Sequence, residues 1–202
     1  MGAIVYSLVY YRNYISIYIS TLGIFDNQTK EGSFDYEDVY RVKFDYPSAF
    51  EKINFFYPRH GLEIGRNGIL LFKVQLVERI ERYGNGDSKP IEYFVQDWNT
   101  NNCNRTPTTS NSKTSRYETT IYEFGGNCDN VDSTVDLSYM HTLSFLSFSN
   151  RVSQANIDTR NVLIKMDGDM NNYLLLVTYY DTPEMRRIMD RVVESIEFER
   201  LI

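Results

Sequence analysis

Several stretches of the chain alternate between apolar and polar residues, which is the period of a β-strand. Residues 69–80 alternate most clearly, with Lys73 and Gln75 on the polar side, and predict a half-buried strand. A nearly continuous apolar run from Tyr173 to Tyr180 predicts a central strand that is covered on both faces. Further alternating segments predict strands at residues 39–44, 91–98, 117–124 and 162–166, and the alternation over residues 135–145 predicts a long strand of roughly fifteen residues that bends or bulges midway.

The C-terminal segment changes to the period of a helix. Asp181 or Thr182 can cap this helix, and Pro183 suits its first position. An apolar stripe at helical spacing then predicts a helix over about residues 183–195, and Ile196–Leu201 returns as a short last strand. Together these elements predict an α+β fold: a mostly antiparallel sheet with one or more helices packed on it, including this C-terminal helix.

Differences in polarity between longer segments divide the chain into three parts. Residues 1–25 are almost uncharged and indicate either a hairpin that turns near Tyr11–Asn13 or a signal-like or membrane-anchor segment. Residues 26–37 are polar and predict a linker. The remainder, 38–202, is expected to form one α+β domain with a polar excursion at residues 99–128.

Composition narrows the classes of protein to consider. Hydrophobic residues make up 42% and charged residues 24% of the 202 residues, which are ordinary values for a globular domain. The 17 Tyr and 12 Phe favour strands, because aromatic side chains pack well on a pleated surface. The net charge of −6 excludes a protein that tracks a nucleic-acid backbone, which needs a basic face. Cations or basic partners are the expected ligands.

Two cysteines give information on the cellular compartment in which the protein folds. Cys103 and Cys128 flank a segment rich in Asn, Thr and Ser, where a packed core would not enclose them. A disulfide closing this loop of about 25 residues would contribute roughly 3 kcal/mol, and two free surface thiols are the alternative. Asn27 and Asn104 each begin an N-glycosylation sequon in a polar stretch. These features favour an extracytoplasmic location, either secreted, periplasm-like or anchored outside.

Two segments resemble PsbP-like proteins. The strand Tyr173–Tyr180, the helix after it and the ending Val193–Phe198 resemble the C-terminal strand, helix and last strand of that family. The segment Tyr40–Phe50 is similar to the family's N-terminal strand and its Tyr-Pro turn. The resemblance implies a PsbP-like domain over 38–202, an extracytoplasmic location and action through binding. Family members in photosynthetic lumens are extrinsic photosystem subunits that help retain calcium and chloride, and no family site residue carries over to this chain.

Candidate chemistry in the sequence is sparse. His60 and His141 are the only histidines, and the sequence contains no nucleophile elbow, phosphate loop, dinucleotide-binding fingerprint or zinc-protease motif, so no catalytic residue is assigned. Asp129, Asp132 and Asp136 lie close together in sequence beside a cysteine and are candidate calcium ligands. No other cofactor site is indicated.

Three functional hypotheses follow. The first is a non-catalytic extracytoplasmic binding or accessory module that associates with a protein complex, with membrane association through residues 1–25 as a further expectation. The second is a carbohydrate-binding or surface-adhesion domain that uses tyrosines and Trp98 as a stacking platform. The third is an enzyme of unrecognised type with at least two carboxylates in a deep pocket.

Overall fold

The structure is a computed structural model that describes residues 28–54, 61–67, 69–78, 80–82, 88–90, 108–114, 117–124, 159–166 and 173–202. Every described strand pairs antiparallel with its neighbours. In the described ranges, the first sheet has three strands in the order β1 (Thr29–Tyr36), β2 (Tyr40–Pro47) and β12 (Glu197–Arg200).

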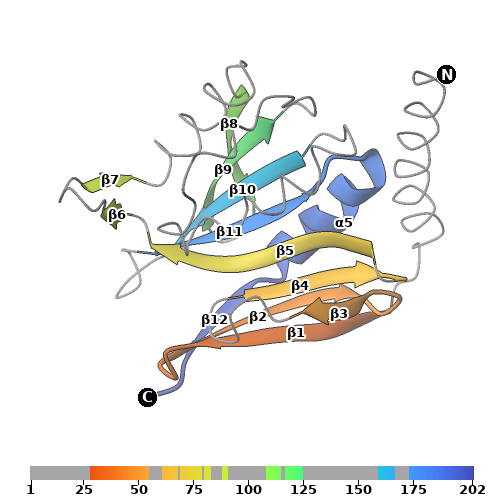
Figure 1. Cartoon of the computed structure of the whole chain (residues 1–202), viewed down its shortest axis with the longest axis horizontal. Helices are drawn as coiled ribbons and strands as arrows, with labels where there is room; N and C mark the ends of the chain where they lie inside the picture. Colours follow the sequence, from red (N-terminus) through yellow and green to blue (C-terminus); the bar gives the residue numbers. More distant parts are fainter. Residues whose placement is uncertain are drawn as a thin grey trace, which may run out of the picture.

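The second sheet forms the larger part of the molecule (Figure 1). Its seven described strands follow the order β3 (Glu51–Asn54), β4 (Gly61–Arg66), β5 (Ile69–Glu78), β11 (Tyr173–Tyr180), β10 (Thr159–Lys165), β9 (Tyr117–Phe124) and β8 (Thr108–Thr114). A small ribbon pairs β6 (Ile80–Arg82) with β7 (Ser88–Pro90). The helix α5 (Pro183–Glu194) completes the described elements. The expected mostly antiparallel sheet with a C-terminal helix is therefore confirmed.

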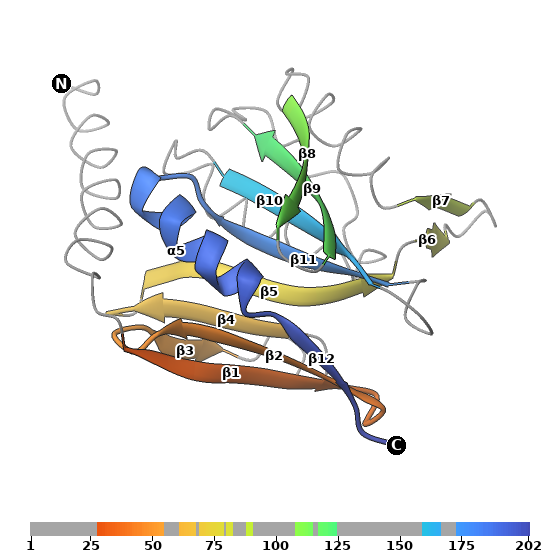
Figure 2. The same ribbon diagram turned by 180° about the vertical axis from the view of Figure 1, so that it is seen from behind.

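The elements lie in two layers. Figure 2 shows the first sheet and α5 side by side on one face of the second sheet. The first residue of β9, Tyr117, reaches the first sheet, and its ring lies 5.2 Å from the ring of Phe198 on β12. The hydrophobic core lies between these layers.

An aromatic cluster joins the two sheets. Phe72 on β5 is fully buried, and the rings of Phe44 and Tyr46 on β2 lie 6.5 Å from its ring. Phe50, just before β3, lies 6.2 Å from the same ring. All three pairs have tilted or edge-to-face geometry, which aromatic rings prefer over a face-to-face stack. Phe72 thus contacts two aromatic side chains of β2 from the second sheet.

Tight turns fix the register of both hairpins. Glu37 and Asp38 have positive φ angles of 50° and 58° in the turn between β1 and β2, which the bond from Val39 N–H to Tyr36 O closes at 3.0 Å. Asn67 has a φ of 54° in the two-residue loop between β4 and β5. Positive φ at these positions matches the right-handed twist of the strands that each turn connects.

The C-terminal helix forms where the sequence predicts it. The Thr182 hydroxyl accepts a hydrogen bond from Met185 N–H at 3.2 Å, and Pro183 occupies the first turn. The apolar stripe is buried, and α5 ends at Glu194 with Ser195 as its C-cap. The predicted strands at 39–44, 117–124 and 162–166 and at the C-terminus are also confirmed, with β2 extending to Pro47.

The polar linker expected at 26–37 is wrong for most of its length, because Thr29–Tyr36 form β1. The segment reads as polar because alternate side chains face solvent. Gly32, Phe34 and Tyr36 face the core instead, and a Cβ on Gly32 would lie only 3.0 Å from ring atoms of Phe44 and Tyr46. One apolar face of a strand therefore lies inside a segment of polar composition.

The polar excursion expected at 99–128 also contains more regular structure than a loop. Thr108–Thr114 form β8, which pairs with β9 over its whole length. A strand at the edge of a sheet needs backbone pairing on one side only, so a sequence of Thr, Ser, Asn and Lys can form it. Composition alone does not reveal such a strand.

The strand β5 is buried on both faces, so the predicted half-buried strand is wrong in this respect. Lys73 is 1% exposed and Gln75 is 4% exposed, although both lie on the polar side of the alternation. The prediction of a central strand covered on both faces is confirmed for β11. The predicted strands at 91–98 and 135–145 lie outside the described residues, as does the segment 1–25. Within the described part of the chain, no helix is long and apolar enough to span a membrane.

Candidate functional site

The site residues predicted from the sequence all lie outside the described residues. This holds for Cys103 and Cys128, for the sequon residues Asn27 and Asn104, and for Asp129, Asp132 and Asp136. It also holds for His60, His141 and Trp98. In the ranges that are described, no group of three or more His, Cys, Asp or Glu side chains could hold a metal ion. The predicted disulfide, glycosylation and calcium sites stay predictions.

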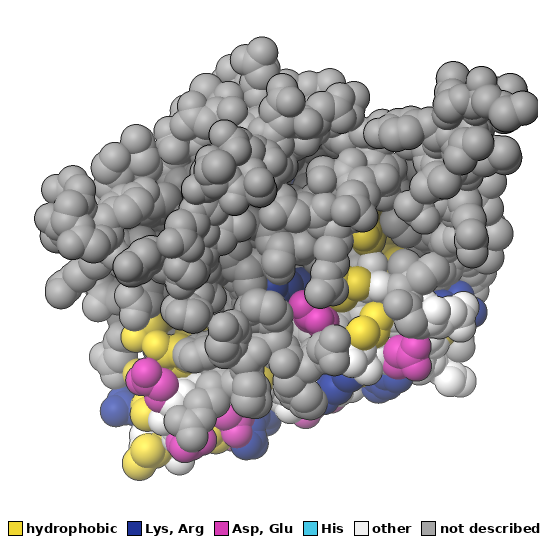
Figure 3. Space-filling view, in the orientation of Figure 1, with side chains coloured by type: hydrophobic (Ala, Val, Ile, Leu, Met, Phe, Trp, Pro, Cys, Tyr) yellow, Lys and Arg dark blue, Asp and Glu magenta, His cyan; other side chains and the backbone are white. Residues whose placement is uncertain are grey.

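A charged surface covers the solvent side of the first sheet. Successive side chains of a strand point to opposite faces, so the residues opposite the core form one continuous surface. We call it the charged sheet face, and its ionisable residues are Glu31, Asp35, Arg41, Lys43, Asp45, Glu197 and Glu199. Five carboxylates and two cations give this surface three negative charges in excess. Acidic and basic side chains are interspersed along the lower margin of the molecule in Figure 3, where Figure 1 draws β1.

Two ion pairs neutralise part of the charged sheet face. Arg41 donates from Nε to Asp35 Oδ1 at 2.6 Å and from its terminal nitrogen to Asp35 Oδ2 at 3.0 Å, which is a bidentate pair. Lys43 Nζ lies 2.5 Å from Glu199 Oε2. The hydrogen bond from Arg41 lowers the pKa of Asp35, and that from Lys43 lowers the pKa of Glu199. Solvent reaches all four side chains, so each pair contributes little to stability.

Two carboxylates of the charged sheet face oppose each other. Glu31 on β1 is the register partner of Asp45 on β2, and both side chains are exposed. Like charges directly opposite each other on adjacent strands are destabilising. A cation placed over this pair would relieve the repulsion. The chain's own Lys43 and Arg41 interact electrostatically with Glu31 and offset part of this repulsion.

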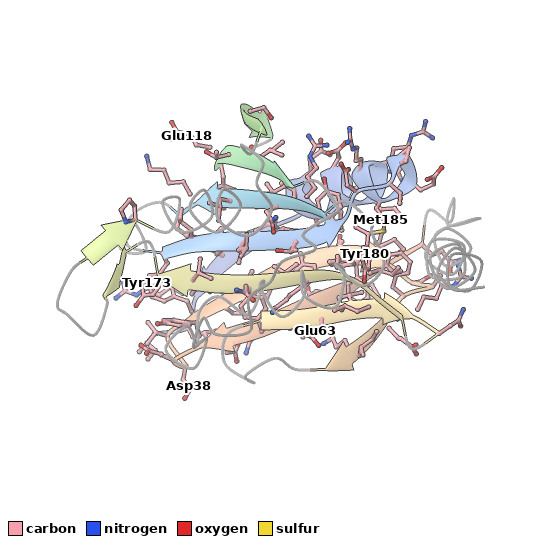
Figure 4. The ribbon with its side chains drawn as sticks, turned by 45° about the horizontal axis from the view of Figure 1, so that its top comes forward. Asp38, Glu63, Glu118, Tyr173, Tyr180 and Met185 are labelled. Carbon is pink, nitrogen blue, oxygen red and sulfur yellow. The ribbon has the colours of Figure 1, made fainter. Side chains whose placement is uncertain are left out.

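A second group of polar side chains is buried on the other face of the second sheet. Glu63, Lys73, Thr178 and Asn161 follow one another in register across β4, β5, β11 and β10. Their exposed fractions are 7%, 1%, 2% and 2%. Figure 4 labels Glu63 on β4, and Tyr173 and Tyr180 at opposite ends of β11. We call these four residues the buried polar row.

Hydrogen bonding in the buried polar row connects neighbouring strands. Thr178 Oγ1 donates to Asn161 Oδ1 at 2.7 Å. A buried polar side chain without a partner is costly, so only registers that provide partners are stable. The row therefore favours one register of the central strands. The row is not evident from the sequence, where Lys73 and Gln75 have the pattern of the solvated side of a strand, because it arises only when separate strands align.

Two tyrosines connect the layers near the β1–β2 turn. Tyr36 on β1 donates a hydrogen bond from its hydroxyl to the Tyr173 hydroxyl at 3.1 Å, and the rings meet edge-on at 5.0 Å. Asp38 extends from the adjacent turn, away from the sheets (Figure 4). The contact ties the turn end of the charged sheet face to β11, so this end of the first sheet is held against the molecule.

Comparisons with known proteins do not assign the chain to a family. No protein family and no curated protein sequence matches it. A crystal structure of a protein from Bacteroides thetaiotaomicron VPI-5482 aligns with 79% of this chain at 8% identity and a TM-score of 0.42. The alignment spans 45% of that protein's length.

Proposed function

We propose that this protein is a non-catalytic extracytoplasmic binding module, accessory to a larger protein complex, and that the charged sheet face contacts a basic surface of its partner. The observation that carries the proposal is the excess of three carboxylates on that face, with Glu31 and Asp45 directly opposed. Complementary charge accelerates encounter and excludes partners of the wrong sign. The net charge of −6 over the whole chain acts in the same direction.

The extracytoplasmic part of the proposal rests on the sequence. Cys103 and Cys128 flank a polar segment, and Asn27 and Asn104 begin sequons. The resemblance of two segments to PsbP-like proteins supports the same location and the binding role. Intact-mass measurement after alkylation, with and without reduction, tests the location on protein purified from its native host. Resistance of both thiols until reduction is the expected result, and free alkylation of both would contradict an oxidising compartment.

Charge reversal tests the binding surface. The double variant Glu31→Lys, Asp45→Lys replaces the opposed carboxylates, whereas Asp190→Lys, Glu194→Lys makes the same change of charge on the exposed side of α5. Partners that co-purify from the native host are identified by mass spectrometry at several salt concentrations. We expect the first variant to lose the partner and the second to keep it, with retention in the wild type falling as salt rises.

Circular dichroism and thermal unfolding of both variants show whether they keep the fold. If the two double variants retain the partner equally, the charged sheet face is not the contact surface. If neither variant nor the wild type retains any protein, the accessory role itself is contradicted.

A further inference from the structure

Among the described strands, β1 lies at one edge of the first sheet. It pairs with β2 on one side, and no other described strand pairs with it. In Figure 2 it forms the lower margin of the molecule. A strand at a sheet edge presents unpaired N–H and C=O groups to any extended segment that approaches.

The hydrogen bonds of β1 identify which residues direct these groups outward. Gln28 O accepts a hydrogen bond from Ser48 N–H at 3.0 Å, one step beyond the Thr29–Pro47 pair. In an antiparallel ladder, hydrogen-bonded and non-bonded pairs alternate. Even-numbered residues of β1 therefore bond to β2. The odd-numbered residues, Thr29, Glu31, Ser33 and Asp35, direct their backbone groups away from the sheet.

The same odd-numbered residues place their side chains on the charged sheet face. A strand added to β1 would hydrogen-bond to Glu31, Ser33 and Asp35, and its residues directly opposite them would project onto that face. Cβ atoms of such cross-strand pairs are roughly 4.5–5.5 Å apart, which suits an ion pair. The backbone pairing and the charge contacts therefore fall on the same alternate residues of the incoming segment.

We infer that the edge of β1 takes up an extended segment of the partner protein with Lys or Arg at alternate positions, in antiparallel strand addition. The inference rests on the proposed function and specifies the shape of the partner segment. Backbone hydrogen bonds supply binding to the edge, and Glu31, with Asp45 opposite it on β2, supplies selectivity for cations. Cationic side chains at alternate positions of the incoming segment would also lie next to the opposed carboxylates Glu31 and Asp45.

The charges on β1 disfavour a second copy of the chain as occupant. Antiparallel pairing of β1 with itself about Ser33 would place Glu31 of each copy opposite Asp35 of the other. Such pairing juxtaposes like charges at two positions and is destabilising. Charged side chains at sheet edges prevent indiscriminate pairing in this way. Glu31 thus both opposes self-association and favours a cationic strand.

N-methylated peptides separate strand addition from simple electrostatic attraction. The probe is acetyl-Val-Lys-Val-Lys-Val-Lys-Val-amide, and its affinity for the full chain is measured by fluorescence anisotropy. In the proposed geometry the lysines that project onto the charged sheet face direct their own N–H groups towards β1. N-methylation of all three lysine amides should weaken binding at least about tenfold. The matched peptide with three N-methylated valines has the same charge and should keep its affinity.

A variant of the chain gives the complementary test. Ser33→Pro removes one outward N–H from the edge, and because that N–H takes no part in the pairing with β2, the fold should be kept. Ser33→Thr is the control. We expect the proline variant to lose the unmodified peptide and the threonine variant to bind it. Should the proline variant not fold, the two N-methylated peptides still decide the question.

Other outcomes distinguish failure of this inference from failure of the proposed function. Equal binding of all three peptides, lost in Glu31→Lys, Asp45→Lys, would leave the charged sheet face as the contact and overturn strand addition. Absence of binding by the unmodified peptide would overturn the cationic strand as occupant. A dimer in analytical ultracentrifugation that Ser33→Pro abolishes would show a second copy at this edge instead. Insensitivity of peptide binding to both charge reversal and N-methylation would contradict both proposals.

Discussion

Phe72 provides the sharpest test of how the two sheets are held together. Its side chain is 0% exposed, and rings of Phe44, Tyr46 and Phe50 surround it at 6.2–6.5 Å. Burial of a phenylalanine side chain contributes about 1.5–3 kcal/mol, and each aromatic pair adds about 0.5–1.5 kcal/mol without being fully additive. Phe72→Ala also leaves a cavity, so we expect a loss of about 4 kcal/mol in the free energy of unfolding.

Phe72→Leu keeps most of the apolar volume but loses the ring contacts, and should cost about 1–2 kcal/mol. The control is Phe198→Leu on β12, because Phe198 is only partly buried and its ring lies 5.2 Å from that of Tyr117. This variant should cost less than about 1 kcal/mol. Urea unfolding at 25 °C, followed by circular dichroism, gives the three values, and equal slopes are required for the comparison. A larger loss for Phe198→Leu than for Phe72→Leu would refute the view that the aromatic cluster holds the layers together.

Three further predictions concern the edges of the fold. Asp38→Gly should stabilise the protein by about 1 kcal/mol in urea unfolding, because glycine adopts the φ of 58° without a Cβ clash. Thr182→Ala should cost about 1 kcal/mol by the same assay, because the Met185 N–H loses its capping acceptor, whereas Thr182→Ser should restore most of the loss. Carboxyl NMR titration should find the pKa of Asp35 below its ordinary value, and Arg41→Gln should raise it. Folding lowers the pKa of Asp35, so the ion pair stabilises the folded protein slightly at pH values above the pKa that Asp35 has in the unfolded chain. This stabilisation is lost as the pH falls through the pKa of Asp35 in the folded protein, below about pH 4. An unshifted pKa would contradict the bidentate pair.

The C-terminal elements could be predicted from the sequence because their signals are local. A cap at Thr182, a proline after it and an apolar stripe define α5 without knowledge of any other strand. The apolar run Tyr173–Tyr180 is similarly sufficient to indicate a central strand, since exposure of either face would be unfavourable. These elements also contain much of the hydrophobic core.

The sequence could not reveal elements whose stability comes from a partner strand. Polar residues of β1 and β8 read as linker and loop, because the hydrogen bonds that order them go to β2 and β9. Lys73 reads as a solvated residue, yet it is buried where strands distant in sequence align. Both are consequences of non-local pairing, which no local period encodes.

The candidate site also has features that the sequence determines and features that only the fold determines. The sequence by itself determined the acidic character of the chain and its C-terminal strand-helix-strand, because charge adds along a chain and helix signals are local. Only the tertiary structure decided that Glu31 and Asp35 of β1, Asp45 of β2 and Glu199 of β12 share one face. The register of two sheet ladders brings these carboxylates together from segments more than 150 residues apart in sequence, and that register is set by the core beneath them.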